Sequence, residues 1–312
     1  MRVVVTGGLG HIGSRLIRKI PEEIPGCEIT IVDNMMCQRF CSLFNLPQGV
    51  KYNFIDGDIL QPEMACIIKG ADVVVNLAAN TEPEKSVGRE AEVENINFIG
   101  TKNLAEYCKK YDVPFIFPSS TSVYTSAESI VDENTFIDIR SAQSPYAKSK
   151  ILSEEYLISQ NKEGLRYTVF RFGTIFGISP GMRFHTAVNK FSYQACKGIP
   201  LTVWETAYNQ RRPYLDIEDA VSVICHIIKN KIYKNEIYNV VTVNATVKDI
   251  IDEISKTISD VEIKYIKSEI MNNLSYDVSC EKIKDTGFEI KGSLSRGVKD
   301  TLKLFEGIWK YR

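Results

Sequence analysis

The hydrophobic residues of this chain gather in short runs that alternate with longer segments of mixed character. Six runs rich in Val, Ile and Phe are almost continuously apolar, which is typical of strands in a parallel sheet covered on both faces. They predict strands at residues 3–6, 28–32, 52–55, 73–77, 115–117 and 167–170. Segments of helical character separate them, at residues 12–20, 61–68, 93–111 and 146–160. The alternation predicts a doubly wound α/β fold.

The pattern loosens from residue 174 onward, where glycine and proline punctuate the chain and the apolar runs shorten. The last part of the chain still contains short helical segments, at residues 247–258 and 294–305. With 312 residues, the chain is long enough for about two domains. We expect a sheet domain at residues 1–173, joined by a returning segment near residues 206–232. Residues 174–312 would mainly form a smaller lobe, folded against the carboxyl ends of the strands.

Composition and charge exclude several classes of protein. Hydrophobic residues make up 44% of the chain and charged residues 25%, as is usual for a folded, water-soluble protein. Lys and Arg number 38 and Asp and Glu 39, so the net charge of -1 offers no excess of positive charge to a nucleic acid or an anionic membrane. No uncharged apolar run approaches about 18 residues, so we expect no membrane span. Met1 leads directly into the first predicted strand, so we expect no secretory signal.

The eight cysteines are scattered along the chain. The closest pair, Cys37 and Cys41, has CxxxC spacing, and neither a second pair nor a nearby histidine completes the ligand set of a zinc site. We therefore expect no structural metal. Thiols distributed in this way favour a reduced, cytoplasmic protein over a disulfide-linked one.

A glycine-rich turn follows the first predicted strand. Gly8, Gly10 and Gly13 form a GxGxxG pattern between that strand and an amphipathic segment. Glycine is needed there because the chain bends tightly, approaches a pyrophosphate closely and then packs its helix against the strand. The next strand ends at Asp33, twenty residues after Gly13, where a carboxylate can bind the ribose hydroxyls of NAD and would repel the 2′-phosphate of NADP. The pattern predicts a Rossmann-type site that prefers NAD, although the nearby Arg39 leaves NADP open.

A tyrosine and a lysine spaced four residues apart are the candidate reactive groups. Tyr146 and Lys150 share one face of the predicted helix at residues 146–160, so both side chains can enter one cleft. A nearby ammonium stabilises a phenolate and lowers the pKa of a tyrosine toward neutrality, which suits a general acid/base. The same YxxxK spacing recurs at Tyr193, but only Tyr146 follows a serine-rich strand end, with Ser120 lying 26 residues before it.

Short motifs after the other strands extend this pattern over nearly the whole chain; they contain Asp58, Ile59, Leu77, Ala78, Ala79, Asn97 and Arg171. In this order the motifs resemble those of extended short-chain dehydrogenases/reductases, and among them the NAD-dependent epimerase/dehydratase family acting on nucleotide sugars, in particular enzymes like UDP-glucose 4-epimerase. The resemblance implies NAD at the carboxyl ends of the strands, with Lys150 on the nicotinamide ribose. The cofactor-binding residues that it implies are Gly7, Gly10, His11, Ile12, Asp33, Asn34, Asp58, Ile59, Leu77, Ala78, Ala79, Asn97, Ser119, Tyr146 and Lys150.

The resemblance also implies a nucleotide-sugar site in the second part of the chain. Arg212 is the first candidate for the diphosphate and Arg183 the second, because a guanidinium fork suits phosphate oxygens. Both could instead be surface arginines on a solvated loop, and Asn189 could be a helix-capping or packing residue. The substrate-binding residues expected on this basis are Ser120, Thr121, Thr174, Arg183, Asn189 and Arg212. The expected catalytic residues are Ser120, Tyr146 and Lys150, of which Ser120 and Tyr146 would contact the reacting sugar hydroxyl.

The residues after Ser120 limit which reactions of the family we expect from this chain. Dehydratases of the family carry an Asp-Glu pair there, and decarboxylating members carry a glutamate just before a Val-Tyr pair. Thr121 and Ser122 occupy these places, and their hydroxyls are too weakly acidic or basic at neutral pH for either reaction. We therefore expect a 4-epimerase of a UDP- or GDP-linked hexose that acts through a transient 4-keto intermediate, with Tyr146 as acid/base.

Other functions stay open. The main alternative is a C4 dehydrogenase or reductase with net redox. A dehydratase and a non-enzymatic NAD-binding protein are weaker alternatives, the latter because a binding module needs none of the three expected catalytic residues. Family members commonly pair their two long helices, here residues 93–111 and 146–160, across a dimer. We accordingly expect a homodimer whose ligands are NAD and a nucleotide sugar, with neither nucleic acid nor membrane as a partner.

Overall fold

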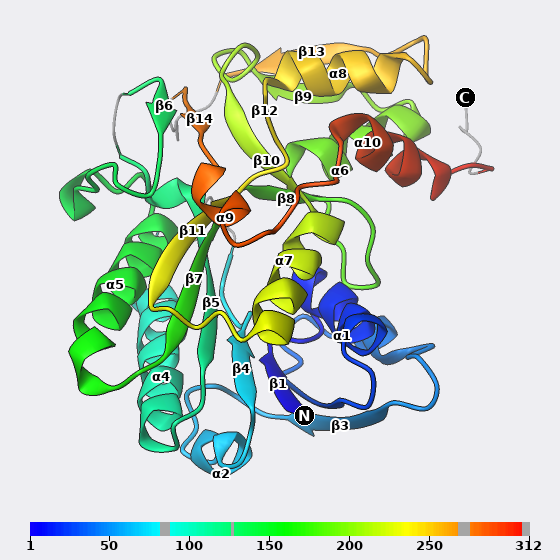
Figure 1. Ribbon diagram of the computed structural model, residues 1–312. Helices are drawn as coiled ribbons and strands as arrows, with labels where there is room; N and C mark the ends of the chain where they lie inside the picture. Colours follow the sequence, from blue (N-terminus) through cyan, green and yellow to red (C-terminus); the bar gives the residue numbers. More distant parts are fainter. Residues whose placement is uncertain (82–87, 126–127, 268–274, 308–312) are drawn as a thin grey trace.

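The computed structural model describes residues 1–81, 88–125, 128–267 and 275–307. In these segments seven parallel strands form a central sheet in the order β11-β7-β5-β4-β1-β2-β3 (Figure 1). The strands are β1 (Arg2–Thr6), β2 (Glu28–Asp33), β3 (Lys51–Asp56), β4 (Val73–Asn76), β5 (Phe115–Ser120), β7 (Tyr167–Phe172) and β11 (Glu236–Val240). The sheet, with helices on both of its faces, confirms the doubly wound α/β fold predicted from the apolar pattern.

The strand order changes direction next to β1. From β1 the chain proceeds through β2 to β3 on one side, and it then returns to β4, which pairs with β1 on the other side. The loops that leave β1 and β4 therefore diverge, and the crevice at the carboxyl ends of two such strands is where doubly wound sheets bind ligands. Both strands are buried, with Val4 and Val74 fully inaccessible to solvent. The crevice therefore lies directly above the packed core of the sheet.

Helices cover both faces of the sheet and have separate apolar cores beneath them. On one face α1 (His11–Glu23) packs against α7 (Ile217–Asn230). On the other face lie α2 (Met64–Ile68), α4 (Gly100–Lys110) and α5 (Pro145–Ser159), with α4 in contact with both of its neighbours. The helices predicted at residues 12–20, 61–68 and 146–160 are confirmed, with ends that differ by up to three residues.

The helix predicted at residues 93–111 is a composite. It begins as α3 (Glu90–Glu94), passes through a π turn at Asn95–Ile99 and continues as α4. A π turn widens the helix locally and is found most often at functional sites. Here it carries Asn97, whose side chain bonds to the backbone of the loop that follows β4.

A smaller lobe lies over the carboxyl ends of the strands, at the top of Figure 1. It contains a three-stranded sheet of β12 (Val243–Ala245), β10 (Arg212–Asp216) and β8 (Thr174–Phe176), and a pair formed by β13 (Ile263–Ile266) and β9 (Leu201–Trp204). Its helices are α6 (Ala187–Lys197), α8 (Val247–Ser255) and α10 (Leu294–Lys303). These elements enclose an apolar core of their own.

The chain crosses between the two parts after β10. Strand β10 belongs to the lobe, α7 lies on the central sheet, and β11 then joins the edge of that sheet beside β7. The apolar pattern does not predict β11, because Glu236 and Asn239 interrupt its hydrophobic run. The shorter elements are η1 (Phe40–Leu43), η4 (Thr121–Val123), β6 (Ile130–Val131), η5 (Ile139–Ser141), η6 (Gln160–Glu163), β14 (Asp277–Val278) and α9 (Glu281–Lys284).

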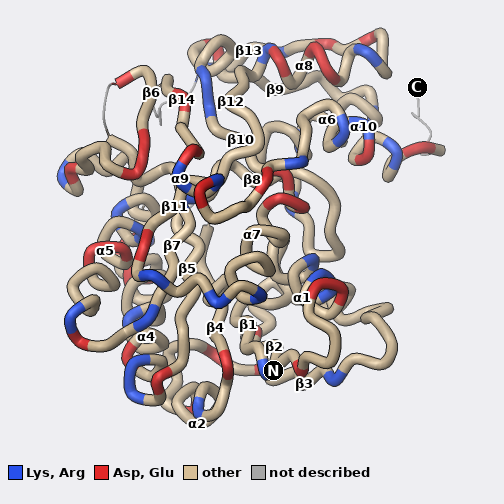
Figure 2. Tube along the Cα trace, in the orientation of Figure 1, with Lys and Arg blue, Asp and Glu red and all other residues tan. Residues whose placement is uncertain are grey.

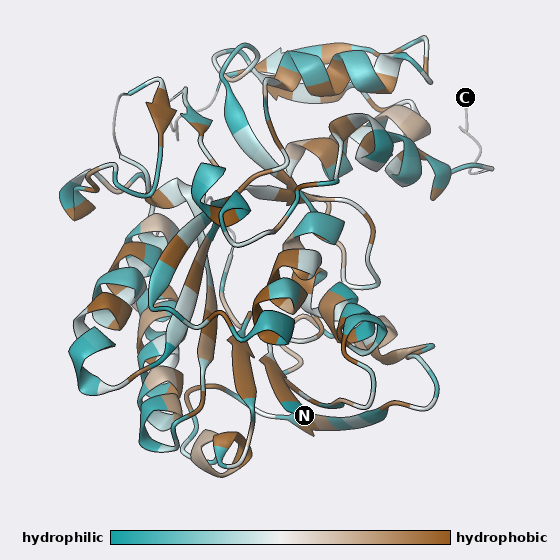
Figure 3. Ribbon diagram, in the orientation of Figure 1, coloured by the Kyte–Doolittle hydropathy of each residue, from teal (hydrophilic) through white to brown (hydrophobic). Residues whose placement is uncertain are grey.

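The distribution of charge and hydropathy agrees with the composition. Lys and Arg alternate with Asp and Glu along the outer helices (Figure 2), and hydrophobic residues concentrate on the central strands (Figure 3). No helix in the described segments combines the length and hydrophobicity that a membrane span requires. Those segments also contain no group of three or more His, Cys, Asp or Glu side chains placed to hold a metal ion.

Candidate functional site

The glycine-rich turn lies at the crevice between β1 and β4. Gly7 has a φ of +64°, and a Cβ at this position would lie 2.6 Å from the backbone nitrogen of Ala78, after β4. A Cβ at Gly13 would lie 2.5 Å from the carbonyl oxygen of Gly7. Helix α1 begins after this turn without a side-chain cap, which leaves its first-turn amides and its positive end to an anionic ligand. The turn therefore fits the close approach of a dinucleotide diphosphate.

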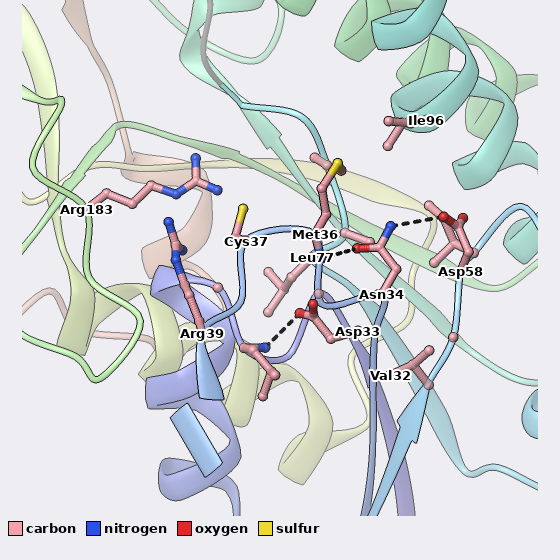
Figure 4. Close-up of a pocket in the computed structure, with 17 residues that line it drawn as sticks. Val32, Asp33, Asn34, Met36, Cys37, Arg39, Asp58, Leu77, Ile96 and Arg183 are labelled. Atoms are coloured by element: carbon pink, nitrogen blue, oxygen red, sulfur yellow. Dashed lines mark hydrogen bonds between the residues drawn. The ribbon is translucent and has the colours of Figure 1, made fainter. Parts of the chain in front are cut away.

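A narrow pocket opens beside this turn (Figure 4). Asp33, at the end of β2, accepts hydrogen bonds from the backbone N–H groups of Leu9 at 3.0 Å and Met35 at 3.1 Å. Asn34 donates to the carboxylate of Asp58 at 2.9 Å. The predicted cofactor-binding residues that line this pocket are Gly7, Gly10, Asp33, Asn34, Asp58, Ile59, Leu77, Ala78 and Ala79.

A second cavity, of about 640 Å³, continues from the first between the sheet and the lobe. The two share Gly7, Gly10, Leu77, Ala79 and Arg183 as lining residues. The other predicted residues that line the larger cavity are His11, Ile12, Ser119, Ser120, Thr121, Tyr146, Lys150, Thr174 and Arg212. Its volume is in the range of small-molecule sites. The fold thus places a dinucleotide crevice next to a cavity for a second ligand.

Tyr146 and Lys150 enter this larger cavity from the first turns of α5. The Ser144 hydroxyl caps the helix by accepting the N–H of Ala147 at 3.1 Å, which fixes where α5 begins. The Nζ atom of Lys150 lies 5.9 Å from the centre of the Tyr146 ring. It also donates to the carbonyl of Pro118 in β5 at 2.8 Å. The predicted pair is therefore held between α5 and the end of β5.

The pKa values of both groups are shifted. Burial raises the pKa of Tyr146 above its usual value, so the lowering predicted from the nearby Lys150 is wrong; a hydrogen bond with Ser120 and the charge of Arg183 act against the rise. Burial lowers the pKa of Lys150 to about 7, and the charge of Glu154 opposes this shift. Titratable groups that are perturbed in this way inside a cavity are typical of a proton-transfer site.

We expect the burial of Lys150 to make the free energy of unfolding depend on pH. Between the folded pKa of about 7 and the unfolded value of about 10.4, the unfolded chain binds a proton that the folded chain does not. The free energy of unfolding should therefore rise with pH across this interval. Below the folded pKa, Lys150 is protonated in both states and does not change the free energy of unfolding with pH. Urea denaturation between about pH 7 and pH 10 measures the effect. The rise should be smaller in Lys150→Met, and equal slopes in both proteins would contradict the shift.

A buried ion pair lies behind the reactive groups. Glu154, one turn after Lys150, pairs with Arg171 of β7, whose Nη2 lies 2.8 Å from Oε2. Ser119 donates to the same carboxylate at 2.5 Å, and Nη1 of Arg171 donates to the Tyr124 hydroxyl at 3.1 Å. This network joins the end of β5 to α5 and β7. The spacing of Glu154 from Lys150 is visible in the sequence, but its partner can be identified only in the folded chain.

Asn97 and Asn189 are buried and are not among the residues that line the two described cavities. Asn97 accepts the N–H of Asn80 at 2.7 Å and donates to the carbonyl of the same residue at 2.9 Å. Asn189 accepts the N–H of Gly177 at 3.2 Å and donates to the carbonyl of Arg183 at 2.9 Å. Each amide therefore fixes a loop beside a cavity, and a ligand contact by either side chain stays a prediction.

The lobe supplies the remaining wall of the larger cavity. Nη2 of Arg212 donates to Gln210 at 3.0 Å, and its guanidinium carbon lies 5.8 Å from the centre of the Tyr276 ring. The Tyr276 hydroxyl donates to the carbonyl of Thr121 at 2.9 Å, and Trp204 of β9 also lines the cavity. The sequence pattern does not identify Tyr276 or Trp204 as site residues, because each reaches the cavity from a segment that carries no motif.

Among the described residues that line the larger cavity, positively charged side chains are present and negatively charged ones are absent. Lys150, Arg183, Lys190 and Arg212 contribute to the lining, and no Asp or Glu does. Ser122 also lines it, and its Oγ atom is buried with no hydrogen-bond partner within the described segments. The cavity therefore suits an anionic ligand that brings hydroxyl groups of its own.

Comparison with known proteins assigns these features to a family. The sequence model described as "NAD dependent epimerase/dehydratase family" matches residues 3–240. The chain is 24% identical over 319 residues to the trifunctional UDP-glucose 4,6-dehydratase/UDP-4-keto-6-deoxy-D-glucose 3,5-epimerase/UDP-4-keto-L-rhamnose-reductase of Arabidopsis thaliana, an alignment that covers 97% of this chain and 47% of the relative. The chain thus spans about half the length of that protein.

Two further relatives align with this chain over most of both sequences. The dTDP-D-glucose 4,6-dehydratase of Homo sapiens is 27% identical over 320 residues, which cover 97% of this chain and 89% of the relative. The crystal structure of UDP-glucose 4-epimerase with UDP-glucose from Thermotoga maritima is similar with a TM-score of 0.86 and 26% identity, and the match covers 99% of each chain. Sequence and fold therefore lead to the same group of proteins as the motifs.

Proposed function

The chain belongs to the NAD dependent epimerase/dehydratase family, and on this basis we propose that it catalyses the 4-epimerisation of a UDP-linked hexose. Membership confirms the resemblance of the motifs, and it confirms NAD as the cofactor. The family alone does not select the reaction, because the human relative is a 4,6-dehydratase and the Thermotoga maritima relative is a 4-epimerase.

The observation that carries the proposal is the composition of the larger cavity. Tyr146, Lys150 and Ser120 line it together, next to the glycine-rich turn, and the described lining contains no carboxylate. Dehydration needs an acid/base pair that removes a proton and protonates a departing hydroxyl. The residues after Ser120 offer instead the hydroxyls of Thr121 and Ser122, which support hydrogen bonding and not elimination. Reversible hydride transfer at C4 needs no further catalytic group.

In the proposed reaction Tyr146 removes the proton of the C4 hydroxyl and later returns a proton to the C4 oxygen. The glycine-rich turn and Asp33 would hold NAD, which when bound would supply the uptake of the C4 hydride and its return to the opposite face of the sugar. Lys150 lies beside the tyrosine, with its Nζ atom 5.9 Å from the centre of the Tyr146 ring, and Ser120 orients the tyrosine by the hydrogen bond between them. The 4-keto sugar rotates inside the cavity so that its opposite face receives the hydride. Because the hydride that leaves C4 also returns to it, the reaction causes no net redox change.

The lobe would bind the nucleoside diphosphate of the substrate. Arg212 lines the cavity next to Tyr276, and Lys190 adds a second positive charge to the same lining. A guanidinium and an ammonium together suit the two charges of a diphosphate. We choose UDP over GDP because the Thermotoga maritima enzyme was solved with UDP-glucose. A homodimer and a cytoplasmic location stay predictions.

Incubation of the protein with UDP-glucose and UDP-N-acetylglucosamine that carry deuterium at C4 tests the proposal. We expect a C4 epimer that retains the deuterium, because the same hydride leaves and returns within one site, and no lasting absorbance in the NADH band. A released ketose with stoichiometric NADH would instead establish the net-redox alternative. A 4-keto-6-deoxy product would establish a dehydratase.

A further inference from the structure

We propose that Arg39 and Arg183 form a clamp on the diphosphate of NAD, so that two side chains from distant segments hold the cofactor in addition to the glycine-rich turn. The sequence motifs assign Arg183 to the sugar diphosphate, and they connect Arg39 only with the 2′-phosphate that NADP would carry. The proposal rests on NAD as the cofactor and is independent of the 4-epimerase reaction.

Both arginines reach the narrow pocket beside the glycine-rich turn. Arg39 comes from the segment between β2 and β3, and Arg183 from the segment between β8 and α6. Figure 4 shows their side chains converging at one side of this pocket, next to Cys37. Arg183 also lines the larger cavity and donates a hydrogen bond to the hydroxyl of Thr81. Its guanidinium therefore lies where the two cavities meet.

The charges of both arginines act on the first turn of α1. Burial is the main cause that lowers the pKa of His11 to about 4; the carbonyl of Gly177 opposes the shift, and the charges of Arg183 and Arg39 add to it. His11 is the first residue of α1, so both guanidinium groups lie within electrostatic range of the helix N-terminus. Two positive charges beside the positive end of a helix favour an anion between them. In a Rossmann-type site that anion is the pyrophosphate of the dinucleotide.

Hydrogen bonds hold the clamp against the glycine-rich turn. Nη1 of Arg39 donates to the carbonyl of Gly181 at 3.0 Å, which joins the two segments that carry the arginines. The Ser179 hydroxyl donates to the carbonyl of His11 at 2.8 Å. A Cβ at Gly181 would lie 2.4 Å from the carbonyl oxygen of Leu9, so the loop touches the turn directly. The guanidinium groups are thus positioned before a ligand arrives, which lowers the entropic cost of binding.

Displacement of bound etheno-NAD, a fluorescent analogue, from the full-length protein tests the clamp. Adenosine and ADP differ by the diphosphate. The affinity for ADP divided by the affinity for adenosine therefore isolates the contribution of the diphosphate to binding. Arg39→Met and Arg183→Met are each expected to lower this ratio by roughly tenfold, the effect of losing one hydrogen bond to a charged group. Arg39→Lys and Arg183→Lys, which keep the charge, should lower it less. Arg140→Met removes an exposed arginine paired with Asp138 and is the control that should leave the ratio unchanged.

Two outcomes would overturn the clamp. An equal loss of affinity for adenosine and ADP would mean that the arginines only hold their loops together. Tighter binding of 2′-AMP than of adenosine, abolished by Arg39→Met, would place Arg39 on the ribose and not on the diphosphate. Because the readout is nucleotide binding, a wild-type protein that failed to epimerise any sugar would refute the proposed function and still give a valid affinity ratio.

Discussion

Phenylalanine in place of Tyr146 should slow the epimerisation of the UDP-sugar by roughly 10³-fold in kcat, within the range of about 10²–10⁴ that a positioned acid/base contributes. The substitution removes a single hydroxyl and keeps the ring, so Lys150 and the start of α5 stay in place. The amount of NAD bound to the purified protein should therefore fall far less than kcat, because the other predicted cofactor-binding residues remain. Epimer formation at saturating UDP-sugar measures kcat, and the absorbance of nucleotide released by denaturation measures NAD.

Tyr193→Phe is the matched control for this experiment. Tyr193 begins the second YxxxK match of the chain, but it lies on α6 and packs against Phe184 and Phe305, with ring centres 5.8 Å and 5.3 Å away. It is not among the described residues that line the larger cavity. Its replacement should leave kcat unchanged. A Tyr146→Phe variant that kept the wild-type kcat would contradict the assignment of Tyr146 as acid/base.

The central sheet could be predicted from the sequence because most positions of its inner strands are apolar. Strands β1 and β4 are buried on both faces by helices, and this environment requires Val and Ile at successive positions. The edge strand β11 escaped prediction because Asn239, which is fully buried, hydrogen-bonds Tyr124 and Ser279 instead of belonging to an apolar pattern. A polar residue in a strand is explained by partners that only the folded chain reveals.

The candidate site likewise contains residues that local sequence patterns predict and residues that only contacts between distant segments bring together. The places of the glycine-rich turn, Asp33 and the Tyr146/Lys150 pair beside the two cavities could be predicted, because they follow from local geometry and fixed spacing. The second part of the chain has no such rule. The motifs place Arg183 on the substrate side alone, whereas its side chain lines both cavities because the loop that carries it is tied to the first turn of α1. Sequence spacing cannot specify a contact between segments so far apart.

Arg171→Met should lower the free energy of unfolding by about 3–5 kcal/mol, which is usual when one partner of a buried ion pair is removed. The side chain of Glu154 is 4% exposed, so the substitution leaves a carboxylate in the interior with the Ser119 hydroxyl as its remaining described partner. Burial alone would lower the pKa of Arg171, but the charge and hydrogen bonds of Glu154 raise it above its usual value. Urea denaturation at neutral pH measures the loss.

The double variant Glu154→Leu/Arg171→Met tests whether the ion pair serves the stability of the fold or also the positioning of the active residues. Two apolar side chains of similar volume remove the unpaired charge, so the double variant should recover most of the stability that the single variant loses. Equal instability of the two variants would contradict the charge-burial explanation. Turnover by the double variant separates two roles for the pair. If stability returns and kcat stays low, the pair positions the end of β5 beside Tyr146 through Ser119; if both return, the pair serves the fold alone.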